Sequence, residues 1–251
     1  MRVNSTWLRL VSPVLALSLG AVPLAAQNVI VNGGFEAGLS GWSVSGATSG
    51  ASCEKNWNAN VTGGTPSGTF HAPGGTDCMG VGTAYAGTMS AFNSFDGRGP
   101  LNYYLTQSFL MPGGVTEARL RFTEAARHAI FAGRVSRTFD VFLISTSGAV
   151  NPFTYTAAPG GGFTTGAGHD WTSYDLDVTS FALANAGEGM TIVFDAYVPE
   201  FFSGPAGMGL DEVSLDVRTG GSVVPEPASI VLLGSGLLFI GGVAARRRNR
   251  T

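Results

Sequence analysis

Charged residues and cysteines are scarce in this chain of 251 residues. Charged side chains make up 12% of the sequence, Lys55 is its single lysine, and Cys53 and Cys78 are its two cysteines. Nucleic-acid-binding surfaces need clustered lysines and arginines, so this shortage argues against that class of partner. Aromatic residues still amount to 10%, which is not the composition of a disordered chain. The sequence therefore predicts a folded domain that does not bind nucleic acid.

The basic residues that are present are concentrated at the two ends of the chain. Residues 27–227, between those ends, contain eight basic residues against all seventeen acidic ones. The other six basic residues are Arg2, Arg9, Arg246, Arg247, Arg248 and Arg250. An acidic body of this kind argues against binding anionic polymers through bulk charge.

The N-terminus has the parts of a secretory signal peptide. Arg2 and Arg9 accompany a mostly apolar stretch, and small residues follow it for cleavage after Ala26. A transmembrane anchor is the alternative, but the apolar stretch is short and a proline interrupts it. We therefore expect a signal peptide over 1–26 and a working domain over 27–222, a length that suits one large β domain.

The expected export bears on the oxidation state of the two cysteines. In an oxidising compartment, Cys53 and Cys78 most simply form a disulfide that closes the Gly-rich loop between them. Such a closure would contribute about 3 to 4 kcal/mol in the loop-entropy description. A metal pair and a nucleophilic thiol are the alternatives, but the sequence supplies neither a second cysteine pair nor an identifiable base.

A membrane-length apolar run lies near the C-terminus, over 228–245. A helix of this length would span about 27 Å, the short end of a bilayer crossing. Backbone groups must be hydrogen-bonded within lipid, so a helix is favoured there despite four glycines. The arginine-rich tail 246–251 follows directly, where the cytoplasmic flank of a span carries positive charge. We predict one C-terminal transmembrane helix over 228–245.

The motif that precedes this run, over 224–227, suggests what the region is for. Pro225, Glu226 and Pro227, followed by the apolar run and the arginines, resemble the PEP-CTERM sorting signal of Gram-negative bacteria. The resemblance implies a sorting segment over 223–251 in which an exosortase recognises these residues. It also implies a membrane-anchored precursor that is processed and delivered to the cell surface or extracellular matrix. A plain C-terminal anchor is the alternative.

Period-two patterns of apolar and polar residues predict many short strands in the body of the chain. Turn residues separate them, and one short helix is expected over 179–186. This arrangement favours an all-β, antiparallel sandwich. The main predicted strands cover residues 101–111, 117–125, 137–145, 171–178, 190–198 and 208–217.

The two ends of the body resemble those of galactose-binding-like jelly rolls, which include many carbohydrate-binding modules. The resemblance rests on the sequence NVIVNGGFE over 28–36 and on GLDEVSL over 209–215. It implies a jelly-roll β-sandwich in which the first and last strands lie together beside a structural Ca²⁺. Glu36 and Asp211 would then be carboxylate ligands, a type of ligand that Ca²⁺ prefers. The alternative is that Glu36 caps a turn and Asp211 is a strand-end acid.

A carbohydrate-binding role needs exposed aromatic side chains together with amides or acids. Trp57, which lies among asparagines, is the first candidate, followed by Tyr85 and Tyr103. For each of them, burial in the core is the alternative. The predicted ligand is an exopolysaccharide outside the cell.

Catalysis has less support in the sequence. The three histidines begin no metal-binding spacing, and His169 beside Asp170 is the nearest approach to a dyad. Asp175 and Asp177 fall on one face of a strand, as the paired carboxylates of a glycosidase must, but also as two solvated positions would. We therefore predict a non-enzymatic, exopolysaccharide-associated protein. The alternatives are a structural or adhesive matrix protein without a sugar ligand and a polysaccharide-acting hydrolase.

Overall fold

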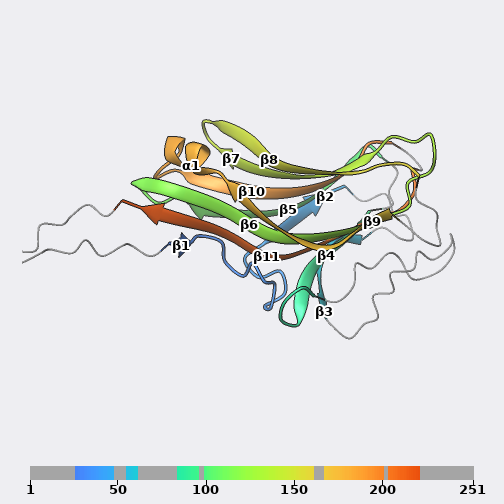
Figure 1. Cartoon of the computed structure of the whole chain (residues 1–251), viewed down its shortest axis with the longest axis horizontal. Coiled ribbons are helices and arrows are strands. Elements are labelled where there is room, and N and C mark those ends of the chain that lie inside the picture. Colours follow the sequence, from blue (N-terminus) through green and yellow to red (C-terminus); the bar gives the residue numbers. More distant parts are fainter. Residues whose placement is uncertain are drawn as a thin grey trace, which may run out of the picture.

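The computed structural model describes residues 26–47, 55–61, 84–95, 99–160, 167–200 and 203–220, and they form two sheets packed face to face (Figure 1). Sheet A has the strand order β3-β4-β11-β6-β9, with β1 paired to β11, and sheet B has the order β2-β5-β10-β7-β8. Every strand pair is antiparallel. The predicted all-β sandwich is therefore confirmed. The elements are β1 (Gln27–Asn28), β2 (Ser43–Gly46), β3 (Lys55–Val61), β4 (Met89–Phe95), β5 (Leu101–Leu110), β6 (Val115–His128), β7 (Arg137–Ser145), β8 (Gly148–Ala157), β9 (Ala167–Asp177), α1 (Thr179–Ala184), β10 (Gly189–Val198) and β11 (Ala206–Thr219).

The core lies between the sheets and follows from the alternation of the long strands. On β7, Phe139, Val141 and Leu143 are buried while the residues between them face outward, as the pattern predicts. The ring of Phe194 on β10 stacks on that of Phe139 at a centroid distance of 6.1 Å. Phe122 on β6 of sheet A meets Phe194 edge to face at 5.9 Å, which joins the two sheets. Each such ring contributes about 1.5 to 3 kcal/mol by its burial.

The first and last strands lie side by side, as the jelly-roll resemblance implies. β1 pairs with β11 in the register Gln27 to Val217. The turn that follows β1 packs closely on β11, because a Cβ on Gly33 would lie 1.8 Å from the carbonyl oxygen of Val213. No other residue fits that position without moving the backbone.

Several predicted features lie outside the described residues. They are the signal peptide 1–26 apart from its last residue, the disulfide between Cys53 and Cys78, and the sorting segment with its span over 228–245. Within the part of the chain that the structure describes, no helix is long and apolar enough to cross a membrane. The short helix predicted over 179–186 is confirmed as α1.

Candidate functional site

Two of the three predicted sugar-binding aromatics belong to the core. Trp57 is 3% exposed, and its indole N–H donates a hydrogen bond of 3.0 Å to the carbonyl oxygen of Tyr103. Tyr103 is itself 0% exposed. The prediction that these residues stack on a sugar is wrong, because both side chains point between the sheets. Tyr85 is 50% exposed, so its binding role stays a prediction.

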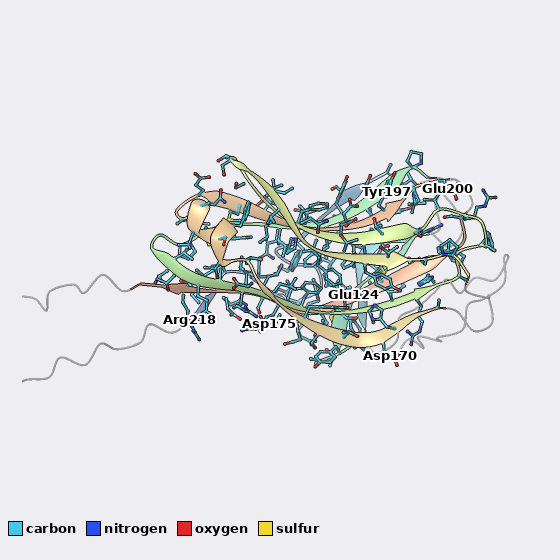
Figure 2. The ribbon with its side chains drawn as sticks, turned by 45° about the horizontal axis from the view of Figure 1, so that its top comes forward. Glu124, Asp170, Asp175, Tyr197, Glu200 and Arg218 are labelled. Atoms are coloured by element: carbon cyan, nitrogen blue, oxygen red, sulfur yellow. The ribbon has the colours of Figure 1, made fainter. Side chains whose placement is uncertain are left out.

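The outward side of sheet B carries a different set of aromatic and polar groups. We call it the sheet-B face and define it by the outward residues of its three central strands. Strand register places Tyr104, Asp195 and Asp140 in one row across the middle of this face. Figure 2 shows Tyr197 on this side of the molecule. The face consists of Asn102, Tyr104, Thr106, Ser108, Thr138, Asp140, Phe142, Thr191, Val193, Asp195 and Tyr197.

Asp195 is the centre of the sheet-B face and is 7% exposed. The Asn102 side-chain amide donates a hydrogen bond of 2.7 Å to its Oδ2. Its Oδ1 has no hydrogen-bond partner among the described residues. Burial, and to a smaller extent the nearby Asp140 carboxylate, raises the pKa of Asp195 to about 6, although the Asn102 bond opposes the shift. Burial and the Asp195 charge also raise the pKa of the Tyr104 hydroxyl.

The neighbouring carboxylate, Asp140, is held in place by hydroxyl and amide donors. It accepts hydrogen bonds of 2.7 Å from the Thr138 hydroxyl, 2.5 Å from the Thr154 hydroxyl and 3.1 Å from the Asn151 amide. On the five strands of sheet B, all of them described, no lysine or arginine faces outward. The face therefore combines hydrogen-bond acceptors and aromatic rings without a cation.

Ion pairs cover the outward side of sheet A. Figure 2 shows Asp170, Asp175 and Arg218 on this side. The Arg119 guanidinium lies 2.8 Å from the Asp175 carboxylate, and that of Arg218 lies 2.6 Å from Glu117. Arg121 binds both Asp175, at 3.2 Å, and Asp216. Arg127 on β6 pairs with Asp170.

This network bears on the glycosidase alternative. The hydrogen bond from Arg119 lowers the pKa of Asp175 most, and the hydroxyl of Thr179 lowers that of Asp177. A glycosidase needs one carboxylic acid that keeps its proton, which a raised pKa provides. Asp175 and Asp177 are shifted the opposite way, so their geometry supports solvated ion-pairing positions rather than an acid–base pair.

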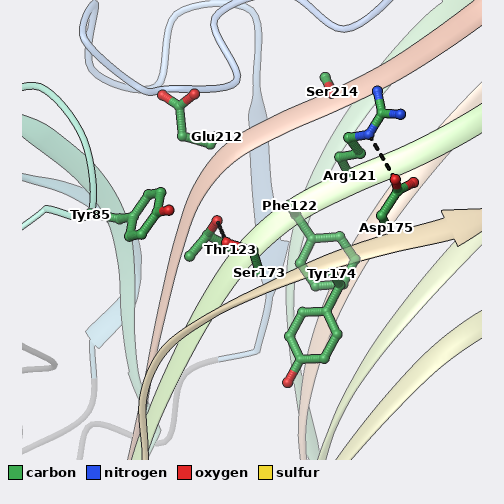
Figure 3. Close-up of a pocket in the computed structure, with 9 residues that line it drawn as sticks. All are labelled: Tyr85, Arg121, Phe122, Thr123, Ser173, Tyr174, Asp175, Glu212 and Ser214. Carbon is green, nitrogen blue, oxygen red and sulfur yellow. Dashed lines mark hydrogen bonds and ion pairs between the residues drawn. The ribbon is translucent and has the colours of Figure 1, made fainter.

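A hollow of about 350 Å³ opens on the outer side of sheet A (Figure 3). Tyr85 stands on one side of it, and the ring of Trp171 lies 6.2 Å from the Tyr85 ring. The hydroxyls of Thr123 and Ser173 are 3.0 Å apart in its floor. The residues around it are Tyr85, Arg121, Phe122, Thr123, Ser173, Tyr174, Asp175, Glu212 and Ser214.

The predicted calcium ligands lie on either side of the segment 85–89. The backbone N–H groups of Tyr85 and Ala86 donate to Asp211 Oδ2 at 3.0 and 3.1 Å. Thr88 donates its N–H and hydroxyl to Glu36, at 2.7 and 2.6 Å. In this arrangement the carboxylates accept hydrogen bonds, and the described residues contain no group of three His, Cys, Asp or Glu side chains that converges on a metal position. A cation would have to displace those donors, so calcium at Glu36 and Asp211 stays a prediction.

A buried acid–histidine pair lies between the sheets and was not expected from the sequence. Glu124 on β6 is fully buried, and its Oε2 lies 3.0 Å from Nε2 of His169 on β9. Burial raises the pKa of Glu124, while the bond to Glu124 raises that of His169. The predicted neighbour pair of His169 and Asp170 is not a dyad, because Asp170 faces outward and binds Arg127 instead. The alternation along β6 could have predicted from the sequence that Glu124 is buried. It could not have predicted His169 as its partner, because that residue lies on β9, far along the chain.

Comparison with known proteins identifies the C-terminal region. Residues 223–248 match the PEP-CTERM protein-sorting motif, and Pro225, Glu226 and Pro227 lie within the match. This motif marks exported proteins that reach the cell surface through a membrane-anchored precursor, and it implies processing by an exosortase. No curated protein sequence is significantly similar to the chain.

Several solved structures are similar to this chain at low identity, each with a TM-score below 0.5. TmCBM61 in complex with β-1,4-galactotriose is 16% identical, with a TM-score of 0.46 over 75% of this chain and 97% of that one. The Stig cyclase Fisc from Fischerella sp. TAU is 14% identical, with a TM-score of 0.45 over 78% and 100%. The family 11 carbohydrate-binding module from Clostridium thermocellum is 11% identical, with a TM-score of 0.38 over 79% and 99%. These likenesses concern the fold alone.

Proposed function

We propose that the domain is a non-catalytic glycan-binding module that an exosortase-dependent route delivers to the cell surface or matrix. The observation that carries the proposal is the row of Tyr104, Asp195 and Asp140 across an outward face without a cation. Its expected ligand is an exopolysaccharide.

The chemistry of the sheet-B face suits a sugar chain. A sugar ring presents C–H groups that pack on an aromatic side chain and hydroxyls that donate hydrogen bonds. Tyr104, Tyr197 and Phe142 supply the rings. Asp195 and Asp140 supply acceptors, and Asp195 Oδ1 has no donor among the described residues. A ligand hydroxyl that reached it would satisfy a buried acceptor, which is costly to leave unpaired.

A structural or adhesive matrix protein without a sugar ligand is the alternative. It would use the same export route and the same fold, but its sheet-B face would contact nothing specific. The hydrolase alternative finds no raised pKa at Asp175 or Asp177, so it would have to use Asp195, whose pKa is raised, beside Asp140.

A glycan array with the fragment 27–222 separates these functions. We expect binding to at least one exopolysaccharide fragment, and weaker binding to that fragment in Tyr104→Ala. Leu183→Ala, which truncates an exposed apolar residue on α1, is the matched control and should bind as the parent does. Absence of binding to every glycan would favour the structural role, and release of shortened glycan would favour the hydrolase.

A further inference from the structure

The hollow on sheet A lies on the opposite side of the sandwich from the sheet-B face. Its volume of about 350 Å³ falls within the range of small-ligand sites, about 300 to 1,000 Å³. β11 is irregular beside it, with a register shift between Asp211 and Ser214. Glu212, in that shift, has a φ of 50°, which is uncommon for a residue other than glycine. Bulges and strained residues gather beside functional sites.

The half-exposed ring of Tyr85 forms one wall of the hollow. Figure 3 shows Tyr85 at the side of the hollow, and among the described aromatic side chains it is the most exposed, at 50%. The ring of Trp171 on β9 lies 6.2 Å from it. The backbone of Tyr85 is fixed, because Asp211 accepts hydrogen bonds from the N–H groups of Tyr85 and Ala86. A ring presented on a fixed backbone can receive a ligand without the entropy cost of ordering a loop.

The charges around the hollow select the kind of ligand. Arg121 is the one cation in its lining, and both Asp175 and Asp216 already bind it. Glu212 adds a further negative charge. The hydroxyls of Thr123 and Ser173 offer donors and acceptors beside them. The site therefore repels carboxylate or sulfate groups and suits an uncharged polyol ring.

We propose that this hollow is a second carbohydrate site, that it takes an uncharged sugar residue on Tyr85, and that the domain bridges two polysaccharide chains through its opposite faces. The bridging rests on the proposed function of the sheet-B face, whereas the sugar site in the hollow does not. Two sites on opposite sides of one rigid sandwich can each hold a separate polysaccharide chain. Such a protein would cross-link a matrix rather than only coat it.

The test uses the full-length chain in lipid nanodiscs at low protein-to-lipid ratio, with empty nanodiscs as background. Turbidity and binding isotherms are measured with neutral dextran, mannan, xylan and β-1,4-galactan, and with alginate as the uronate polymer. We expect at least one neutral polymer to bind and its mixture with the protein to become turbid, whereas alginate should neither bind nor cause turbidity. Tyr85→Ala should abolish the turbidity, because the one remaining site cannot join two chains, while the isotherm should keep the binding of the sheet-B face. Tyr85→Phe keeps the ring and should behave as the parent does.

Each other outcome identifies which site fails. If Tyr85→Ala cross-links as the parent does while Tyr104→Ala loses all binding, the second site is overturned and the proposed function stands. If Tyr104→Ala changes nothing and Tyr85→Ala loses all binding, the hollow is the sugar site and the sheet-B face is not. Preference for alginate would overturn the uncharged ligand, and binding to none of the polymers would overturn both proposals.

Discussion

The two outward faces of the sandwich handle charge in opposite ways. On sheet A, each of the four outward arginines of β6 and β11 lies against a carboxylate. On sheet B, Asp140 and Asp195 lie in one row, and none of the outward residues on its strands is basic. Paired surface charges keep a face soluble at little gain in stability. An unpaired, nearly buried carboxylate lowers stability, and such groups occur where a ligand is bound.

The largest effect should come from the buried pair beneath sheet A. His169→Ala leaves Glu124 without the group that most lowers its pKa, so the fully buried carboxylate becomes uncompensated. We expect a loss of about 3 kcal/mol in the free energy of unfolding, measured in urea at pH 7. The pKa of Glu124 rises further in this variant, so the loss should shrink as the pH falls and Glu124 takes up a proton. Glu124→Gln in the same chain should restore most of the stability, and failure of that rescue would contradict the explanation.

The next largest change in stability should come from Ca²⁺ bound beside the segment 85–89 on the sheet-A side. If Glu36 and Asp211 bind Ca²⁺, an excess of about 100 times the dissociation constant adds about 2.7 kcal/mol. The melting temperature should then rise with CaCl₂ and fall with EDTA, and Asp211→Asn should remove the response. If neither CaCl₂ nor EDTA changes the melting temperature, the role of Glu36 and Asp211 is to accept hydrogen bonds from the segment 85–89.

Asp195→Asn should raise the free energy of unfolding, whereas His169→Ala should lower it. The folded protein holds the proton of Asp195 more tightly than an ordinary carboxyl group, because its pKa is raised from 3.8 to about 6. Ionisation therefore penalises the folded state as the pH rises from about 4 to about 6, and the full penalty persists above that range. We expect the variant to be about 1 to 3 kcal/mol more stable at pH 7, no more stable near pH 4, and unable to bind glycan at the sheet-B face. A variant that binds normally would remove Asp195 from the site.

The sandwich itself could be predicted from the sequence because the inward and outward residues of its long strands alternate in a visible pattern. On β7, Phe139, Val141 and Leu143 alternate with Thr138, Asp140 and Phe142, and the structure buries the first set. Strand β3 was not among the predicted strands, although Trp57, Ala59 and Val61 alternate with asparagines in its sequence KNWNANV. It is a strand because β4 offers it hydrogen bonds, a tertiary influence that local pattern does not contain.

The sites were harder to predict than the fold for a related reason. Trp57 lies among asparagines, which suggested exposure, yet Asn56 and Asn58 bind backbone groups while the ring points inward. The row of Tyr104, Asp195 and Asp140 joins three strands that are far apart in the sequence. Composition along the chain cannot show such a row, since it exists only once the register is set.

Tyr197 offers a smaller test of the sheet-B face. Tyr197→Ala removes an outward ring beside the central row, so we expect about a tenfold loss of glycan affinity by calorimetry, equal to about 1.4 kcal/mol. The melting temperature should change little, because the side chain is only half-buried. Tyr197→Phe is the control that retains the ring. Equal affinity in all three proteins would confine the ligand to other parts of the face.

The smallest effect should come from the sheet-A ion pairs. Arg119→Gln breaks the contact with Asp175, but both side chains are partly exposed and Arg121 still holds that carboxylate. Exposed pairs contribute about 0 to 1 kcal/mol and weaken as salt increases, so the free energy of unfolding should fall by less than about 1 kcal/mol, and by less still in high salt. Glycan binding on the sheet-B face should be unchanged. A large loss of stability would mean that the paired charges carry the fold, and a loss of binding at the sheet-B face would mean that the two faces are not independent.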